Sequence, residues 1–413
     1  MGYRSLEKLF YMGRPPERLA ENERLARQRL LDDSSFRTGF DTDAGELFLA
    51  VPRELSVLNE QVLTREREVS DAAAGLPPIA LGALIRSLVI DEVVSTNELE
   101  GVYSTRKQIS DLLDGSDAPR GEGSDDRRFR ELAHIYLELS DQDRLIPSTP
   151  QDVRLIYDRI MHGEDLGGNS PDGVLFRKDG VEIIGQGGKV IHTGVVPEDK
   201  IISSVETMLS VANSDDIPPI YGAIISHFLF EYIHPFYDGN GRTGRYLLAL
   251  CLTRSLSTLT ALSLSRTIAE NKAGYYRGLR EAEQRLNHGE LTFFVMSLME
   301  YIGDAQSRLI DDLQAKRDRL DGASERLSEL ESKGAYKKPE LDILFILAQY
   351  ALFAAFPATT LDVITGCLTV GKQSARKYLK RLEEGNMVEV VTRRPLRFVL
   401  SDDGMRDFGI EEL

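Results

Sequence analysis

Residues 234–245 read His-Pro-Phe-Tyr-Asp-Gly-Asn-Gly-Arg-Thr-Gly-Arg, and this stretch decides how the chain around it folds. The apolar run 221–233 before it predicts a buried helix, which the pair His234-Pro235 ends because proline disfavours helical geometry in the preceding residue. Residues 238–241 then predict a tight turn, since their two glycines can adopt positive φ. Residues 242–253 carry an apolar stripe at helical spacing. The sequence therefore predicts two helices joined by a short polar turn.

The groups at this turn suit chemistry on a nucleotide phosphate. Free N–H groups and the dipole at a helix N-terminus favour an anion in front of it. Arg242 and Arg245 lie three residues apart and reach the same side of the helix. Asp238 offers the hard oxygen that Mg²⁺ takes together with substrate phosphates. His234 is the side chain here that can take a proton near neutral pH. The alternative is a histidine at a helix end before an ordinary turn, but all these features in this order favour the phosphate site.

The stretch resembles the signature of the Fic (filamentation induced by cAMP) family, His-Pro-Phe-x-Asp/Glu-Gly-Asn-Gly-Arg-x-x-Arg, at every defined position. Fic proteins typically transfer AMP from ATP to a Ser, Thr or Tyr hydroxyl of a protein, so the resemblance implies ATP and Mg²⁺. It implies His234 as the catalytic base and Asp238 as the ligand of Mg²⁺. The other implied nucleotide contacts are Gly239, Asn240 and Gly241 at the α-phosphate and Arg242 and Arg245 at the outer phosphates. The related Doc-type kinases are expected to carry lysine where this chain has Gly241, so glycine favours nucleotidyl transfer.

A second motif lies upstream of the signature. Residues 79–94 have apolar residues at helical spacing and run into Ser-Thr-Asn-Glu-Leu-Glu-Gly at 95–101. The spacing Thr96-x-x-x-Glu100-Gly101 resembles the Fic inhibitory motif, whose glutamate pairs with the second arginine of the signature, here Arg245. One guanidinium cannot hold a carboxylate and the γ-phosphate together, so the resemblance implies that Thr96 and Glu100 inhibit. In some relatives the same glutamate positions a water that removes AMP. The alternative is a helix that ends in an ordinary glycine cap.

A hairpin is predicted between the two motifs. Residues 174–177 and 181–184 are short β-type runs around Lys-Asp-Gly at 178–180, and Asp-Gly is a strong hairpin signal. Its position resembles the Fic flap, which pairs with an extended target segment and aims the target hydroxyl. The expected target-docking residues are Val181, Glu182 and Ile183. We expect His192, further along, to be structural rather than catalytic. The alternative is a plain surface hairpin.

The C-terminal part of the chain predicts three helices and then two strands, at 341–353, 359–364, 372–384, 387–391 and 396–400. This order resembles a winged-helix domain, which many Fic proteins append. The expected basic face consists of Lys372, Arg376, Lys377, Lys380, Arg381, Arg393, Arg394 and Arg397. Such a face suits DNA phosphates, which makes DNA a candidate partner of residues 370–397. The alternative is a wing that docks a protein or a second copy.

The expected fold class is mostly α: a Fic-type helical core with a β-hairpin flap, followed by a small winged helix-turn-helix domain. The expected segments are an N-terminal arm, a region with the inhibitory helix, the Fic core, a linker helix and the winged-helix domain, at 1–45, 46–128, 129–303, 304–337 and 338–413. We expect the arm to be charged and loop-like and 115–128 to be a polar loop. The thin leucine stripe of the linker helix is expected to pack on a partner subunit, in a homo-oligomer.

Composition limits the class of protein. A formal net charge of -16 over 413 residues disfavours nonspecific binding of the whole surface to nucleic acid or acidic membranes. No run is long and apolar enough to span a bilayer, and the N-terminus lacks the apolar core of a signal peptide. The two cysteines, Cys251 and Cys367, fall on helix faces predicted to be buried, as free thiols do in a reducing cytoplasm. We therefore expect a cytoplasmic protein with no membrane partner.

Two classes of function follow from these residues. The first is a protein adenylyltransferase that Glu100 inhibits, with another protein and itself as targets. The alternative is a nucleotide-sensing, DNA-binding transcriptional regulator. The intact His234 favours the enzyme, because a pure sensor has no use for a catalytic base.

Overall fold

The computed structural model describes residues 2–114, 124–141, 146–184, 188–368, 370–393 and 395–410. In these residues the chain is mostly helical with small antiparallel sheets, which confirms the mostly α fold class. The chain divides into two compact units. The first contains Met1–Arg67, Glu92–Ser104 and Gly121–Ser307, and the second contains Glu68–Asp91, Thr105–Arg120 and Arg308–Leu413. None of the helices that the structure describes combines the length and apolarity needed to cross a bilayer.

The first unit holds most of the helices and two hairpins. Its helices are α1 Leu6–Met12, α2 Arg18–Leu30, α6 Ser124–Leu137, α7 Pro150–Ile160, α8 Glu198–Ala212, α9 Pro219–Ile233, α10 Asn240–Leu252, α11 Thr258–Ala261, α12 Leu264–Glu270 and α13 Lys272–Ala282. Its strands are β1 Ser35–Thr42, β2 Gly45–Ala50, β3 Glu182–Ile184 and β4 Val190–Thr193. Three long helices contribute residues to both units: α3 Arg53–Ala73, α4 Pro78–Leu99 and α14 Thr292–Ser332.

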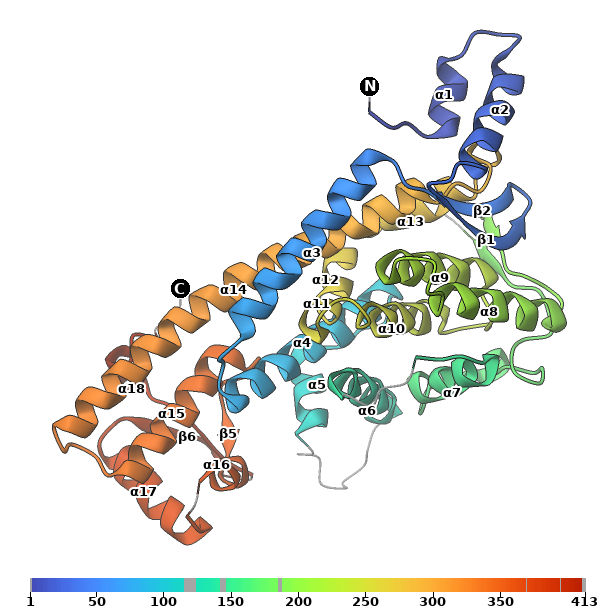
Figure 1. Ribbon diagram of the computed structural model, residues 1–413. Coiled ribbons are helices and arrows are strands. Elements are labelled where there is room, and N and C mark those ends of the chain that lie inside the picture. The colour runs from blue at the N-terminus through green and yellow to red at the C-terminus, as the bar shows by residue number, and fades with distance from the viewer. Residues whose placement is uncertain are drawn as a thin grey trace. The chain divides into compact units, whose positions relative to one another are not determined.

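Helix α9 forms the centre of the first unit. It begins with Pro219 in its first turn, where the missing N–H of proline costs no hydrogen bond. Its side chains from Ile220 to Phe230 are buried, and α8 and α10 pack along it (Figure 1). A helix that is apolar on all sides is stable only when neighbours cover it on all sides. The predicted buried helix is therefore present, and its C-terminal end is held in a fixed place.

The prediction that residues 1–45 are loop-like is wrong. They form α1, α2 and strand β1, which pairs antiparallel with β2. The side chain of Ser5 caps α1 by accepting a hydrogen bond from the N–H of Lys8. Leu6, Ala26 and Phe40 are buried, while the many charged residues lie on the outer faces. The high charge of this segment suggests a loop, although its residues form two amphipathic helices and a strand.

The second unit carries the C-terminal elements. Besides parts of α3, α4 and α14, it contains α5 Arg106–Leu113, α15 Lys338–Phe353, α16 Leu361–Cys367, α17 Lys372–Glu384, α18 Asp402–Asp407, β5 Thr359–Thr360, β6 Val388–Arg393 and β7 Leu396–Leu400. The strands form one antiparallel sheet in the order β5-β7-β6. The three helices and two strands predicted from the sequence are all present in their predicted order. The hydroxyl of Thr360 caps α16, as a threonine at that position favours.

Several finer expectations for this part of the chain are corrected. Arg397 is buried and forms an ion pair with Asp114 at 2.9 Å, so it does not belong to an exposed basic face. Arg381 remains exposed as expected, although it pairs with the buried Glu340 at 3.0 Å. Cys251 is buried as expected, whereas Cys367 is exposed. Arg394 lies outside the described residues.

Two predicted connections also differ from the structure. Residues 304–332 of the linker helix predicted at 304–337 belong to α14, which is continuous from Thr292 to Ser332, and residues 333–337 follow its end. Its leucine stripe, Leu309, Leu313, Leu320 and Leu327, is buried in the single chain, so this stripe offers no surface to a partner subunit. Of the loop predicted at 115–128, residues 115–123 lie outside the described part of the chain, and residues 124–128 belong to α6.

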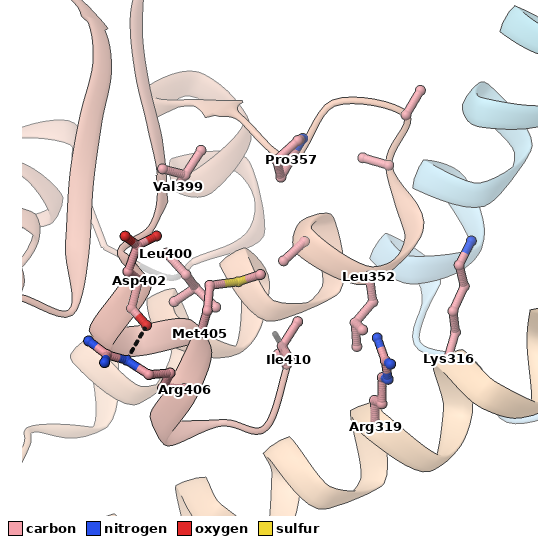
Figure 2. Close-up of a pocket in the computed structure, with 13 residues that line it drawn as sticks. Lys316, Arg319, Leu352, Pro357, Val399, Leu400, Asp402, Met405, Arg406 and Ile410 are labelled. Atoms are coloured by element: carbon pink, nitrogen blue, oxygen red, sulfur yellow. Dashed lines mark hydrogen bonds between the residues drawn. The ribbon is translucent and has the colours of Figure 1, made fainter. Parts of the chain in front are cut away.

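The second unit contains a cavity of about 1010 Å³ between α14, α15, β7 and α18. Figure 2 shows the apolar side chains of Leu352, Leu400 and Ile410 around it, with Lys316 and Arg319 reaching from α14. None of the residues that the sequence predicts for the functional site lines this cavity. The predicted site lies wholly in the first unit.

Candidate active site

His234 follows the last residue of α9 in a left-handed conformation, with φ 50° and ψ 61°. Its ring Nδ1 lies 3.3 Å from the carbonyl oxygen of Glu231. Because a carbonyl can only accept, Nδ1 carries the proton and the lone pair of Nε2 stays free. Burial lowers the pKa of His234 from the usual 6.5 to about 4. The ring is therefore neutral at physiological pH and can accept a proton at Nε2.

The turn after His234 is shorter than predicted, because α10 already begins at Asn240. The buried amide of Asn240 accepts the N–H of Phe236 at 3.0 Å and donates to the carbonyl of Phe236 at 2.8 Å. This double contact closes the turn and leaves Gly239 in the left-handed region at φ 79°. A Cβ at Gly239 would also come within 2.9 Å of Met161 Cε, so the position requires glycine for space as well as for φ.

The N-terminus of α10 is the place in the site that suits an anion. Its first intrahelical bond runs from the N–H of Thr243 to the carbonyl of Gly239 at 3.1 Å. The N–H groups of Asn240, Gly241 and Arg242 precede that bond and have no carbonyl of the helix to donate to. With the positive end of the helix dipole, they form the cradle that the sequence predicts for a phosphate.

Asp238 is exposed at the edge of this turn. Its Oδ1 accepts the N–H of Gly239 at 2.6 Å, which fixes the carboxylate against the turn. No group of three or more His, Cys, Asp or Glu side chains suited to a metal occurs among the described residues. Magnesium that arrives with a nucleotide needs only one or two carboxylates from the protein. One exposed, oriented carboxylate fits that requirement.

Arg242 is buried, and its Nη1 forms an ion pair with Glu164. The second oxygen of Glu164 lies 3.5 Å from Arg128 Nη1. The Nε of Arg242 is buried with no partner among the described residues. A buried N–H without an acceptor is unfavourable, so this guanidinium is incompletely satisfied by the described residues. No sequence pattern indicates Glu164 as a partner of Arg242, because it lies 78 residues before it.

Arg245 connects the two sequence motifs, because Thr96 and Glu100 of the upstream motif both contact its guanidinium. Its Nε donates to the hydroxyl of Thr96 at 2.7 Å, and its Nη2 donates to Glu100 Oε1 at 2.7 Å and to the carbonyl of Thr96 at 3.1 Å. Burial acts to lower the pKa of Arg245, but the charge of Glu100 raises it above its usual value. Burial likewise acts to raise the pKa of Glu100, and Arg245 outweighs this and holds it below its usual value. Both groups are therefore charged and paired.

Glu100 also lies against the N-terminus of α10. A Cβ built at Gly241 would overlap the carboxylate, with Glu100 Cδ only 2.7 Å away and Arg245 Nη1 2.9 Å away. The carboxylate thus occupies the region in front of the helix that favours an anion. A side chain at position 241 would therefore require the carboxylate of Glu100 to move.

Two buried acidic residues near Arg245 were not predicted. Burial raises the pKa of Glu231 to about 7, and Oε1 of this residue has no hydrogen-bond partner among the described residues. A Cβ at Gly244 would lie 2.5 Å from that oxygen, so Glu231 packs against α10. Burial raises the pKa of Glu92 to about 7 as well, and this carboxyl accepts the N–H of Ser265 at 3.1 Å. Neither residue stands in a motif, so only the folded chain reveals them.

The hairpin before His234 exists, but its first strand is not the one predicted. β3 pairs antiparallel with β4 in the register Glu182 with Thr193 and Ile183 with His192. Residues 174–177 form no strand, because the N–H groups of Val174, Leu175 and Phe176 donate to the carboxylate of Glu198 at 2.8 to 3.0 Å. The Asp-Gly pair at 179–180 therefore precedes β3 and does not form the hairpin turn.

The predicted docking residues lie in and beside β3. Glu182 and Ile183 belong to the strand, and Val181 precedes it, with its carbonyl accepting the N–H of Gly194 at 3.0 Å. Next to it on β4, both ring nitrogens of His192 are engaged, Nδ1 with Glu283 Oε2 at 2.8 Å and Nε2 with the carbonyl of Tyr232 at 2.8 Å. This pairing agrees with the expected structural role of His192.

Comparison with known proteins identifies the class of this site. Residues 147–252, which contain the hairpin, His234 and most of α10, match the model of the Fic/DOC family. This match assigns residues 147–252 to the Fic/DOC family. In overall fold it is similar to a Fic family protein from Desulfovibrio desulfuricans G20, with a TM-score of 0.52 and 20% identity over 85% of this chain and 97% of that one.

Curated relatives in sequence are named protein adenylyltransferases. The protein adenylyltransferase Fic of Nematostella vectensis is 29% identical over 150 residues, 36% of this chain and 32% of the relative. That of Drosophila mojavensis is 24% identical over 265 residues, 62% of this chain and 48% of the relative. Protein adenylyltransferase fic-1 of Caenorhabditis elegans is 34% identical over 122 residues, 29% of this chain and 22% of the relative. The chain thus spans less than half the length of each of these relatives.

Proposed function

We propose that this protein is an adenylyltransferase that transfers AMP from ATP to a Ser, Thr or Tyr hydroxyl of a protein. The observation that carries the proposal is the pairing of a neutral His234, with Nε2 free, and the anion-favouring start of α10 a few residues later. The names of the relatives agree with it. A proton acceptor beside a phosphate cradle is what nucleotidyl transfer to a hydroxyl requires.

In the proposed reaction the target hydroxyl oxygen attacks the α-phosphorus of ATP. Nε2 of His234 takes the hydroxyl proton, and the bond from the α-phosphorus to its bridging oxygen breaks. The products are the adenylylated protein and pyrophosphate. The N–H groups of Asn240 and Gly241 stabilise the α-phosphate, and Arg242 and Arg245 stabilise the charge that develops on the leaving pyrophosphate. Magnesium bound with ATP neutralises phosphate charge, and Asp238 is its proposed protein ligand.

The same geometry supports inhibition by Glu100, with Thr96 as the second partner of Arg245. The carboxylate of Glu100 lies on Arg245 and over Gly241, where the outer phosphates would need the guanidinium. A carboxylate and a phosphate cannot both accept hydrogen bonds from the single guanidinium of Arg245, so ATP and Glu100 compete. Removal of AMP from a modified protein is the second reaction that a carboxylate at this place could support, by orienting water.

The target segment is proposed to pair with β3. An extended segment can add to the free edge of a two-stranded hairpin, so that Val181, Glu182 and Ile183 hold it by main-chain bonds. Strand addition selects an extended main chain more than a particular sequence. It is therefore consistent with hydroxyl side chains of other proteins and of the chain itself as targets.

Label transfer tests this function. The full chain and its Glu100→Gly variant are incubated with Mg²⁺ and ATP labelled either at the α- or at the γ-phosphate. We expect label from α-labelled ATP only, a mass gain of one adenylyl group, and loss of both in Glu100→Gly/His234→Ala. Transfer of the γ-label, or equal labelling without His234, would refute the proposal. Preformed adenylylated protein tests removal in the same assay.

The C-terminal unit supports a second candidate function, binding of DNA by a winged-helix domain at 338–413. Helix α17 buries Ala375, Leu379 and Leu382 on one face. Its opposite face exposes Lys372, Arg376, Lys377 and Lys380. A helix with an exposed cationic face beside a two-stranded wing suits contact with DNA phosphates. In this reading α17 is the recognition helix and the Fic unit regulates it.

A further inference from the structure

Arg177 is the largest fully buried side chain in the described part of the protein, with 0% of its surface exposed. Its guanidinium donates to carbonyl oxygens: Nε to His234 at 2.8 Å, Nη1 to Asp179 at 2.6 Å, and Nη2 to Val195 at 2.8 Å and to Ile233 at 3.3 Å. No carboxylate is among these acceptors. A buried cation held only by main-chain carbonyls fixes the backbone at each of them.

The acceptors belong to two segments that the reaction needs. Ile233 and His234 end α9 and carry the base, while Asp179 and Val195 flank the hairpin β3–β4. Two main-chain bonds reinforce the connection: the N–H of Arg177 donates to Pro235 at 3.2 Å, and that of Val195 donates to Ile233 at 3.1 Å. Asp179 and Val195, at the base of the hairpin, are thus bonded to the turn at 233–235 around one guanidinium.

Gly194 marks how closely these parts approach. A Cβ at this glycine would overlap Arg177 Nη2 and would lie 2.9 Å from Val181 Cγ1 and 3.2 Å from His234 Cβ. Arg177, the first docking residue and the base therefore surround one point in the structure.

The conformation of His234 needs such support. A non-glycine residue in the left-handed region, such as His234, is strained and persists only where its surroundings hold it. The carbonyls at the C-terminal end of α9 also carry the negative end of the helix dipole, which favours a cation there. Arg177 supplies both the cation and a rigid fork that reaches several carbonyls at once. Lysine has a single ammonium and could not bond all of them.

We propose that Arg177 is a positioning residue that couples the target-binding flap to His234, so that a hydroxyl held on the flap meets Nε2 of the base. This role rests on the proposed transfer reaction. Arg177 touches neither ATP nor the hydroxyl. Its loss should therefore lower the rate of transfer and leave nucleotide affinity unchanged.

Two variants and one control test the proposal in the full chain. Arg177→Lys keeps the charge but not the fork, and Gly194→Ala crowds the guanidinium without removing it. The control is Arg154→Met, because Arg154 also donates to this region, to the carbonyl of Leu175 at 2.8 Å, but does not contact the catalytic turn. Hydrogen exchange of residues 190–195 and 233–236 is measured without substrate. In the Glu100→Gly background, the rate of self-labelling and the ATP dissociation constant are measured as well.

We expect Arg177→Lys and Gly194→Ala to speed exchange in both segments together. We also expect them to slow labelling about tenfold or more, with the ATP dissociation constant within about twofold of the parent. Arg154→Met should change neither segment. Unchanged exchange in both variants, or exchange that rises in one segment only, would overturn the coupling. A parallel loss of ATP binding would assign Arg177 a general structural role. If the parent labels nothing, the proposed function fails, while the exchange data still decide whether Arg177 couples the two segments.

Discussion

Glu100 and Gly241 share one small volume at the start of α10, although 141 positions separate them in the sequence by their numbers. The Glu100 carboxylate fills the space that a Cβ at position 241 would take, and the same carboxylate is bonded to Arg245 at 2.7 Å. A helix N-terminus and a buried guanidinium both attract anions. The carboxylate of the chain therefore occupies the position in which the proposed function places the phosphates of ATP.

Replacement of Glu100 by glycine should activate the protein. Without the carboxylate, Arg245 and the N-terminus of α10 become available to phosphate, so we expect ATP to bind about tenfold more tightly or better. Self-labelling from α-labelled ATP should rise with it. Isothermal titration and label transfer measure the two effects. Glu98→Gly is the matched control, because Glu98 is exposed near the same end of α4 and has no bond to Arg245. Equal activation by both variants would show that helix weakening, not the carboxylate, is responsible.

Gly241→Ala should destabilise the protein chiefly through Glu100. The added methyl collides with the carboxylate, which must give up its bond to Arg245 and leave a buried cation unpaired. In the Glu100→Gly background the two nearest of these contacts, both with the carboxylate, are gone, so the same substitution should cost less. A thermal double-mutant cycle should give a coupling on the order of 1 kcal/mol or more. If the changes in unfolding free energy of the two substitutions are additive, Glu100 and a side chain at position 241 do not compete for the same space.

The sequence predicted those parts of the site that a local pattern encodes. The end of α9 follows from Pro235, and the start of α10 lies among the glycines of the turn. The resemblance of 96–101 to the Fic inhibitory motif anticipated the pair Glu100–Arg245, whereas the contact of Thr96 with Arg245 is seen only in the structure. The two residues are one helical turn apart, so both can reach Arg245.

Partners that only tertiary structure brings together escaped prediction. Glu164 forms an ion pair with Arg242, and Glu198 accepts the N–H groups of residues 174–176. Neither glutamate lies in a sequence motif that predicts its partner. The hairpin was assigned to the wrong strand for this reason. A β-type run whose N–H groups are taken by a distant carboxylate cannot pair as a strand, and the sequence of the run does not reveal that carboxylate. The β-type run 174–177 likewise gives no indication that Arg177 is buried.

If α17 binds DNA, the affinity of the full chain for a duplex should fall steeply as salt rises. Each phosphate contact that is lost should reduce the slope of log K against log salt by about 1. We expect this reduction for Arg376→Ala and for Lys377→Ala, which are exposed on α17. Lys189→Ala, an exposed lysine beside the flap, should leave the slope unchanged. Fluorescence anisotropy with a labelled duplex measures it. Absence of binding at low salt would instead favour a wing that docks a protein.

The pH dependence of transfer should follow the unusual environment of His234. Because burial lowers the pKa of this ring to about 4, the base is already neutral at pH 5.5, where an ordinary histidine with a pKa of 6.5 would be mostly protonated. In the Glu100→Gly background, we therefore expect the rate of self-labelling to change less than about twofold between pH 8 and pH 5.5. Glu231, whose pKa burial raises to about 7, changes charge within that range. The Glu231→Gln variant is therefore measured in parallel. If the rate of both proteins stays constant over this pH range, neither protonation of Glu231 nor that of His234 limits transfer there.

The same pKa makes the fold sensitive to acid, and the sign follows from proton binding. Between pH 6.5 and about pH 4 the unfolded chain protonates His234 and the folded chain does not, so stability falls as the pH is lowered through this range. The His234→Gln variant lacks this group and should lose less of its thermal midpoint between pH 7 and pH 5 than the parent does. Differential scanning calorimetry at both pH values measures the two losses. Equal losses, together with a rate that drops around pH 6.5, would mean that the ring is solvated and that its burial does not set its proton affinity.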